Sequence, residues 1–357
     1  MQKAYLILEN GTIFEGKSFG AEGEAVGEIV FTTAMTGYLE TLTDPSYYGQ
    51  IVVQTFPLIG NYGVIPSDFE SEKPHVKAYI VRQWCQDPSN FRCEGDLDTF
   101  LKSNGIVGLY GIDTRALTKI VRESGVMNGK IVKEGSGFSF GDLKSYKVTD
   151  AVKNTTCKKI EVVKPEGKTK RRVALYDFGA KRNICRELVK RGCEVTILPA
   201  STPAEEVRKL APDGIMLSNG PGDPAENTDI IEEIAKLCKL RIPTFGICLG
   251  HQLLALSQGA RTEKLKYGHR GANQPCTDTK SGRVYITSQN HGYAVINSSL
   301  PEGAKASFVN ANDGTCEGVS YDYMPAFSVQ FHPEACGGPL DTGFLFDKFI
   351  EMIDRKD

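Results

Sequence analysis

The second half of the chain alternates short apolar runs with segments that have the spacing of amphipathic helices. The runs predict strands at 173–176, 194–198, 214–217, immediately before Cys248, 283–288 and 326–331. The segments between and after them predict helices at 183–191, 203–210, 230–240 and 341–354. Because strands that alternate with helices form parallel sheets covered on both faces, this half is predicted to be α/β, with a doubly wound, mostly parallel sheet.

The first half has more alternating runs and fewer helical segments. Strands are predicted at 4–8, 12–15, 28–32, 50–54 and 76–84, and helices at 97–102 and 114–122. Asp113 or Thr114 caps the second helix and Gly125 stops it. Residues 125–172 lack a regular pattern, and their last part is polar and basic, as solvated linkers are. We therefore predict a β-rich α+β domain at 1–150, a linker at 151–171 and the α/β domain at 172–357.

Composition narrows the classes of function. A chain of 357 residues can bury two cores, and a net charge of −2 gives no electrostatic reason to expect nucleic acid or an anionic membrane as partner. No apolar run approaches the roughly 20 residues of a membrane span, and the first residues do not form a signal peptide. The ten cysteines are scattered without a metal-binding pair, which predicts reduced thiols in a cytoplasmic protein.

The turn between the strand before Cys248 and the following helix carries the strongest motif. Residues 246–250 read Gly-Ile-Cys-Leu-Gly, the pattern of a nucleophile on a cramped strand-to-helix turn. The helix N-terminus favours a thiolate, and the N–H of Leu249 is placed to hold an oxyanion. A buried structural cysteine between two turn glycines is the alternative.

Two other predicted strand ends carry compatible chemistry. His332 follows the run 326–331 and offers a base, with the carboxylate of Glu334 two residues further on. A loop with Gly220 and Gly222 follows the run 214–217 and offers backbone N–H groups for an oxyanion. A surface histidine and a solvated carboxylate are the alternatives, but ligands of parallel sheets sit at the carboxyl ends of strands. All three strand ends therefore favour one site.

Residues 11–18 match a phosphate-binding loop, Gly-x4-Gly-Lys-Ser. The interior Thr-Ile-Phe is bulky and favours a strand. Residues 19–24 have no helical period, whereas a true phosphate loop opens a helix. We therefore predict a β-hairpin and no nucleotide site here.

Cysteine, histidine and glutamate in this order resemble the triad-type (class I) glutamine amidotransferases. Four segments of the first half, 31–38, 43–47, 59–63 and 111–115, resemble the N-terminal domain of carbamoyl phosphate synthetase small subunits. The resemblance covers nearly the whole chain. It implies that Cys248, His332 and Glu334 hydrolyse glutamine through a thioester and that the ammonia passes to an ATP-dependent large subunit, for arginine or pyrimidine biosynthesis.

The same resemblance implies which residues bind glutamine. They are Ser46, Gly220, Gly222, Leu249, Gln252, Asn290, Gly292 and Tyr293, where Tyr293 replaces a phenylalanine found in many relatives. His291 is tempting as an alternative base but is ranked structural or positional. The remaining histidines lie apart from metal-like spacing, so no metal or cofactor is expected in this chain, and ATP and magnesium are expected on the large subunit.

Three alternatives stay open. One is an amidotransferase for another product, such as GMP, CTP or anthranilate, although those enzymes lack this N-terminal domain. The second is a stand-alone γ-glutamyl hydrolase, and the third is a catalytically silent regulatory module.

Overall fold

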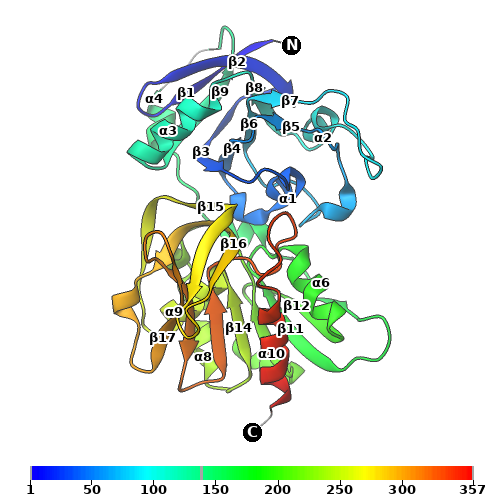
Figure 1. The fold of residues 1–357 in the computed structure, drawn as a ribbon, viewed down its shortest axis with the longest axis vertical. Helices are drawn as coiled ribbons and strands as arrows, with labels where there is room; N and C mark the ends of the chain where they lie inside the picture. Colours follow the sequence, from blue (N-terminus) through cyan, green and yellow to red (C-terminus); the bar gives the residue numbers. More distant parts are fainter. Residues whose placement is uncertain (1, 137–139, 356–357) are drawn as a thin grey trace. The chain divides into compact units, whose positions relative to one another are not determined.

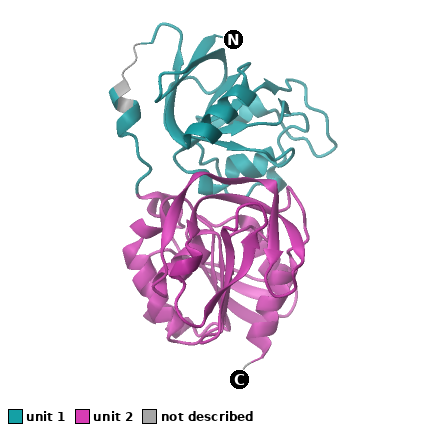
Figure 2. Ribbon diagram, turned by 60° about the vertical axis from the view of Figure 1, so that its left-hand side comes forward, with its two compact units in different colours: residues 1–149 teal, residues 150–357 magenta. Residues whose placement is uncertain are grey.

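A computed structural model describes residues 2–136 and 140–355 and divides the chain into two compact units, Met1–Thr149 and Asp150–Asp357 (Figure 2). The outermost residues of the predicted domains, 1 and 356–357, lie outside the described residues. The structure corrects the prediction of a linker at 151–171, because this segment belongs to the second unit. It holds α5 (Ala151–Thr155) and β10 (Glu161–Val163), and Val152 is buried in a hydrophobic core.

The first unit is built on a closed barrel with the strand order β1-β2-β8-β6-β4-β3-β9. Its strands are β1 (Lys3–Leu8), β2 (Ile13–Gly20), β3 (Ala25–Thr32), β4 (Gln50–Gln54), β6 (Ala78–Val81), β8 (Val107–Tyr110) and β9 (Met127–Lys133). Two short strands, β5 (Leu58–Ile59) and β7 (Gln83–Trp84), pair separately. The helices are α1 (Tyr38–Thr43), α2 (Leu97–Ser103), α3 (Thr114–Ser124) and α4 (Phe140–Ser145). The β-rich α+β prediction is confirmed.

Strand β9 corrects the prediction that 125–172 lack regular structure. It pairs antiparallel with both β1 and β3 and so closes the barrel. The sequence of β9, MNGKIVK, has a weak apolar alternation, and its partners lie about a hundred residues away in the chain. Residues 137–139, within the same predicted range, lie outside the described residues.

Two local predictions in this unit are confirmed. Helix α3 begins after Asp113, whose side chain accepts a hydrogen bond from the N–H of Ala116, and it ends at Gly125. The apparent phosphate loop is a β-hairpin, since residues 13–17 pair with β1. The element after β2 is strand β3, not a helix, so this segment lacks the helix N-terminus that a phosphate loop uses.

The second unit is a ten-stranded sheet of order β10-β12-β11-β13-β14-β19-β18-β17-β15-β16 (Figure 1). Besides β10, its strands are β11 (Arg171–Asp177), β12 (Cys193–Pro199), β13 (Gly214–Leu217), β14 (Thr244–Ile247), β15 (Thr262–Asp278), β16 (Val284–Val295), β17 (Ala304–Asn310), β18 (Cys316–Tyr321) and β19 (Ala326–Val329). Strands β12, β11, β13, β14 and β19 run parallel, as predicted. Beyond β19 the pairings of β18, β17, β15 and β16 are antiparallel, so the sheet has a larger antiparallel part than expected.

Helices cover both faces of the parallel part, and the pattern of alternate residues explains why. Ala174 and Tyr176 of β11 pack into one core with α7 (Ala204–Leu210), α8 (Thr228–Cys238) and α9 (Leu249–Ser257). Val173 and Leu175, one residue out of phase, pack into the other core with α6 (Arg182–Lys190) and α10 (Phe344–Asp354). The doubly wound fold class is therefore confirmed, and it brings the carboxyl ends of β13, β14 and β19 to one edge.

Candidate active site

Cys248 lies on the turn between β14 and α9 and has the backbone conformation of a nucleophile elbow. Its φ is 53° and its ψ is −103°, backbone angles that residues other than glycine rarely adopt. The residue is 3% exposed, and its N–H donates to the carbonyl of Val329 in the neighbouring strand β19 (2.9 Å). The turn therefore holds the sulfur at the N-terminus of α9, as the motif predicts.

The two glycines of the motif are required by close approach. A Cβ on Gly250 would lie 2.2 Å from the carbonyl oxygen of Leu217, on the adjacent strand β13. A Cβ on Gly246 would lie 2.8 Å from the carbonyl oxygen of Gly250 itself. Both distances are too short for any side chain, so the helix can start this close to the sheet only with glycine at both positions.

His332 and Glu334 form a buried hydrogen-bonded pair after β19. Nδ1 of His332 lies 2.7 Å from Oε1 of Glu334, which fixes Nε2 as the nitrogen available for proton transfer. Nε2 has no hydrogen-bond partner within residues 2–136 and 140–355. Burial and the nearby Lys181 lower the pKa of His332, but Glu334 and the sulfur of Cys248 outweigh them and raise the pKa above its usual range. The ring is thus held protonated beside the sulfur.

Glu334 is accompanied by a buried cation that the sequence analysis missed. Nζ of Lys181 lies 3.7 Å from Oε1 of Glu334, and the lysine side chain is 10% exposed. Burial alone would raise the pKa of Glu334, but the effects of His332 and Lys181 are larger and bring the pKa below its usual range. Lys181 lies just beyond the carboxyl end of β11, a position from which parallel sheets commonly present functional side chains.

The loop after β13 lies against the elbow. A Cβ on Gly220 would come within 2.3 Å of the carbonyl oxygen of Phe178 and 2.7 Å of the Leu249 side chain. Gly222 has a φ of +91°, which favours glycine. Leu249 is the first residue of α9, where N–H groups have no partner within the helix. This arrangement brings the predicted oxyanion donors Leu249 and Gly220 together.

Strand β16 supplies the third side of the site. The carbonyl oxygen of Asn290 lies 3.8 Å from the sulfur of Cys248. Gln252 Nε2 donates to the carbonyl oxygen of Tyr293 (2.7 Å) and to Oε1 of Gln330 (2.8 Å). A Cβ on Gly292 would lie 3.1 Å from the Arg270 side chain. The predicted residues Gln252, Asn290, Gly292 and Tyr293 are therefore assembled next to the nucleophile, and Gln330, which sequence reasoning missed, helps to hold Gln252.

Ser46 is placed in the first unit. It lies in a short 3-10 helix, Pro45–Tyr47, and is buried, with its N–H donating to Oδ1 of Asp44 (2.9 Å). Its role in glutamine binding stays a prediction.

Two other cysteines, Cys316 and Cys336, would have to be considered if Cys248 were not the nucleophile. Burial raises the pKa of the Cys316 thiol to about 12, which leaves it protonated at neutral pH. Cys336 is exposed, and its sulfur accepts a hydrogen bond from Nδ2 of Asn183 (3.2 Å). Neither lies at a strand-to-helix turn with a positive φ, so Cys248 is the better candidate.

His251 lies three residues beyond the nucleophile. Its burial makes the stability of the protein depend on pH. It is fully buried, its Nδ1 lies 2.8 Å from the Ser328 hydroxyl, and burial lowers its pKa to about 3. Between pH 6.5 and 3 the unfolded chain binds a proton here that the native protein does not, so stability falls as the pH falls through this window. At pH 5 this linkage destabilises the native state by about 2 kcal/mol.

We expect His251→Gln to flatten the acid side of the stability profile. Urea unfolding of the variant and wild type between pH 7 and 5, followed by circular dichroism, measures the slope. His75→Gln, in the first unit, is the control for losing one histidine. An unchanged slope in His251→Gln would contradict the assignment.

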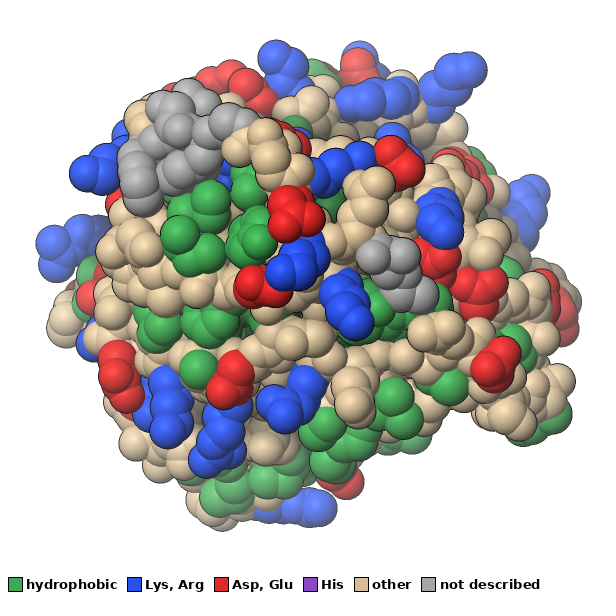
Figure 3. All heavy atoms as spheres, turned by 90° about the horizontal axis from the view of Figure 1, so that it is seen from above, with side chains coloured by type: hydrophobic (Ala, Val, Ile, Leu, Met, Phe, Trp, Pro, Cys, Tyr) green, Lys and Arg blue, Asp and Glu red, His purple; other side chains and the backbone are tan. Residues whose placement is uncertain are grey.

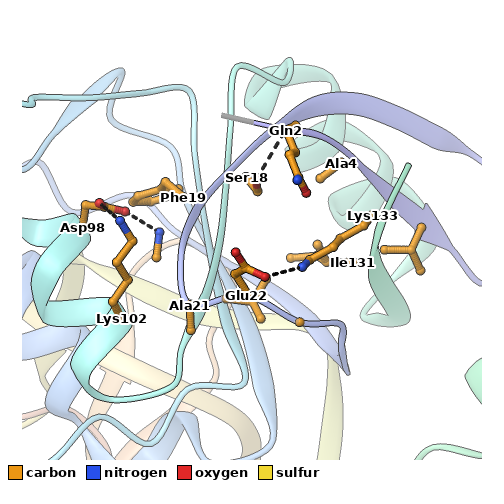
Figure 4. A pocket seen from close by; sticks show the side chains of 14 residues that line it. Gln2, Ala4, Ser18, Phe19, Ala21, Glu22, Asp98, Lys102, Ile131 and Lys133 are labelled. Atoms are coloured by element: carbon orange, nitrogen blue, oxygen red, sulfur yellow. Dashed lines mark hydrogen bonds and ion pairs between the residues drawn. The ribbon is translucent and has the colours of Figure 1, made fainter. Parts of the chain in front are cut away.

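The chain also contains features outside the triad. His269, His291 and Glu317 bring one ligand atom each to within 4.8 Å of one another, a grouping that sequence spacing did not predict. In the first unit a hollow of about 300 Å³ is lined mostly by uncharged residues, with four charged side chains among them, and Figure 4 shows Glu22 toward Lys133 and Asp98 toward Lys102. These charges pair with each other (3.0 Å and 2.5 Å), so the hollow offers a weaker case for a functional site than the elbow.

The surface charges, the thiols and the helices were also compared with the composition. Basic and acidic side chains are interspersed over the face shown in Figure 3. All ten cysteines are free thiols. Among the described residues, no helix is both long enough and apolar enough to cross a bilayer.

Comparison with known proteins accounts for both units. Residues 6–131 match the family model "Carbamoyl-phosphate synthase small chain, CPSase domain", and residues 174–352 match "Glutamine amidotransferase class-I". The chain is 53% identical over 351 residues to the carbamoyl phosphate synthase small chain of Clostridium perfringens, covering 98% of this chain and 99% of the relative. It is 51% identical to that of Fusobacterium nucleatum (99% of each chain) and 48% identical to that of Syntrophotalea carbinolica (99% and 98%).

Proposed function

The chain belongs to the carbamoyl-phosphate synthase small-chain family and is a glutamine amidotransferase subunit, and from this premise we propose how it works. Cys248 hydrolyses glutamine to glutamate and ammonia through a thioester, and the ammonia passes to a large synthetase subunit. The observation that carries the proposal is Cys248 on its left-handed turn beside the buried His332–Glu334 pair.

The first half-reaction forms the thioester. The sulfur of Cys248 attacks the side-chain carboxamide carbon of glutamine, and the carbonyl oxygen becomes an oxyanion. His332, which holds a proton beside the sulfur, delivers it to the nitrogen as the carbon–nitrogen bond breaks, and ammonia leaves. Glu334 keeps the ring in the required orientation by accepting a hydrogen bond from the Nδ1–H group of His332.

The second half-reaction regenerates the thiolate. Water, deprotonated by His332, attacks the thioester carbon, and the carbon–sulfur bond breaks. Glutamate forms, and the sulfur leaves as a thiolate beside the protonated His332. In both steps the N–H groups of Leu249 and Gly220 or Gly222 hold the oxyanion. Their position at a helix N-terminus and in an adjoining glycine loop supports this role.

Glutamine is held by residues around the elbow. Gln252, Asn290, Gly292 and Tyr293 bind the amino-acid end, supported by the contacts that assemble them beside the sulfur. A role of Ser46 in binding glutamine is supported by the resemblance of residues 43–47 to the family alone.

The ammonia is used by a partner. We propose that the first unit docks the large subunit, which binds ATP and magnesium and makes carbamoyl phosphate from bicarbonate and the delivered ammonia for arginine or pyrimidine biosynthesis. This chain itself needs no cofactor or metal. The cytoplasm is its compartment, since ten free thiols suit reducing conditions.

Stimulation by the partner tests the proposal. The isolated chain should release glutamate slowly, and addition of the large subunit with ATP and bicarbonate should raise glutamate release by at least about tenfold, since assembly completes the site. Glutamate is measured enzymatically, and large subunit without ATP is the control. Full activity without the partner would favour a stand-alone hydrolase, and no activity in either state would favour a silent module.

A further inference from the structure

A buried cluster of polar side chains, not used by the triad, lies next to the β16 segment that carries Asn290 and Tyr293. Its members are His269 on β15, Gln289 and His291 on β16, and Glu317 on β18, and the exposed Asp313, before β18, contacts His269 at the edge of the cluster. The side chain of Glu317 is fully buried and that of His291 is 1% exposed. Burying such groups is costly unless each one has partners, so their contacts define what the cluster does.

Glu317 and His269 form the charged end of the cluster. Nδ1 of His269 lies 3.3 Å from Oε1 of Glu317, and Nε2 lies 2.9 Å from Oδ2 of Asp313. Burial lowers the pKa of His269, but the two carboxylates raise it above its usual range. Burial also raises the pKa of Glu317, so the two buried groups share one proton across this contact.

The second oxygen of Glu317 orients an amide. Gln289 Nε2 donates to Oε2 of Glu317 (3.0 Å), and the Thr287 hydroxyl and Cys276 sulfur each lie 3.2 Å from the same nitrogen. With three acceptors around its nitrogen, the amide of Gln289 must turn its oxygen the other way. That oxygen lies 3.0 Å from Nε2 of His291.

His291 passes this orientation to the backbone beside the nucleophile. Its Nδ1 lies 2.8 Å from the carbonyl oxygen of Tyr293, which also accepts the hydrogen bond from Gln252. Each ring nitrogen of His291 thus faces an oxygen, and because burial and the nearby His269 lower its pKa, the neutral ring donates to one of the two oxygens at a time. Glu317 is joined by consecutive contacts, through Gln289 and His291, to the peptide that closes the glutamine site.

We propose that Glu317 is a positioning residue for glutamine hydrolysis, which orients Gln289 and His291 and so holds the Tyr293 carbonyl and the adjoining backbone in place. This inference rests on the proposed function of this segment in binding glutamine. It also assigns the His269, His291 and Glu317 grouping to direct hydrogen bonding among protein groups.

Kinetics of Glu317→Leu test the inference. Loss of the acceptor should raise KM for glutamine about tenfold and leave kcat within about twofold, because the segment holds substrate and transition state alike. Glu317→Gln keeps an acceptor oxygen and should bring KM to within about threefold of wild type. Asp313→Asn is the matched control, since it removes a carboxylate from the same histidine without touching Gln289, and its KM should equal that of wild type.

A second substitution, at another residue of the same series of contacts, provides an independent test. Gln289→Met should raise KM as Glu317→Leu does, and the double variant should be no worse than either single variant, because both break one chain. A folded Glu317→Leu or Gln289→Met with wild-type KM, or additive effects in the double variant, would overturn the inference. If Glu317→Leu does not fold by circular dichroism, Gln289→Met decides alone.

Calorimetry separates this inference from the proposed function. Wild-type protein that releases no glutamate would contradict the function. Glutamine affinity, measured in a Cys248→Ser background with and without Gln289→Met, would still report on positioning. An affinity about tenfold weaker with Gln289→Met supports the inference, and an equal affinity overturns it.

Discussion

Replacing Cys248 by serine should reduce glutamine hydrolysis by at least about a thousandfold while glutamine binding stays measurable. Serine preserves the shape of the elbow, but a hydroxyl is a far poorer nucleophile than a thiolate at neutral pH. The buried His332–Glu334 pair is held in a charge state suited to a thiolate partner and would not readily activate a hydroxyl. Glutamate release measures hydrolysis, and calorimetry measures binding.

The exposed thiol of Cys336 provides the matched control. Cys336→Ser should hydrolyse glutamine at the wild-type rate, because this residue lies outside the elbow. Wild-type turnover in Cys248→Ser would remove the assignment of the nucleophile and return Cys316 and Cys336 to consideration.

In the complex with a large subunit, Cys248→Ser and His332→Asn should abolish synthesis of carbamoyl phosphate from glutamine and spare synthesis from an added ammonium salt. Both substitutions stop the release of ammonia in this chain, whereas the ATP-dependent steps are proposed to lie on the other chain. The glutamine-dependent rate should fall by at least about a thousandfold and the ammonia-dependent rate should stay within about twofold of wild type.

Both rates can be measured on one reconstituted sample, with gel filtration to confirm that the variant chain stays bound. Loss of the ammonia-dependent rate in a bound, folded variant would mean that the triad does more than supply nitrogen. Such a result would contradict the proposed division of labour between the two subunits.

The triad could be predicted from the sequence because each member lies in a recognisable local pattern. Cys248 stands between glycines that only a tight strand-to-helix turn requires, and His332 and Glu334 sit two residues apart at a strand end. The parallel part of the sheet was predictable for the same reason, since the apolar runs 173–176, 194–198 and 214–217 each lie within a single strand. Local patterns therefore sufficed to predict the core of the fold and to single out a candidate nucleophile and base.

Features that depend on pairing between distant segments were missed. Lys181 reaches Glu334 across 153 positions in the chain (334 − 181), and no motif links them. Glu317, Gln289 and His269 belong to three strands whose antiparallel register decides which side chains meet. Strand β9 was missed because its apolar alternation is weak and its pairing with β1 and β3 is what stabilises it.

The positive φ of Cys248 lowers the stability of the chain at the position where its chemistry requires a thiol. A residue with a side chain at φ 53° costs on the order of 1 kcal/mol or more relative to glycine, which adopts this region freely. The most stable form of this turn is therefore one without a sulfur. Substitutions chosen only to raise the melting temperature would favour an inactive chain, so thermal stability is a misleading guide to engineering at this position.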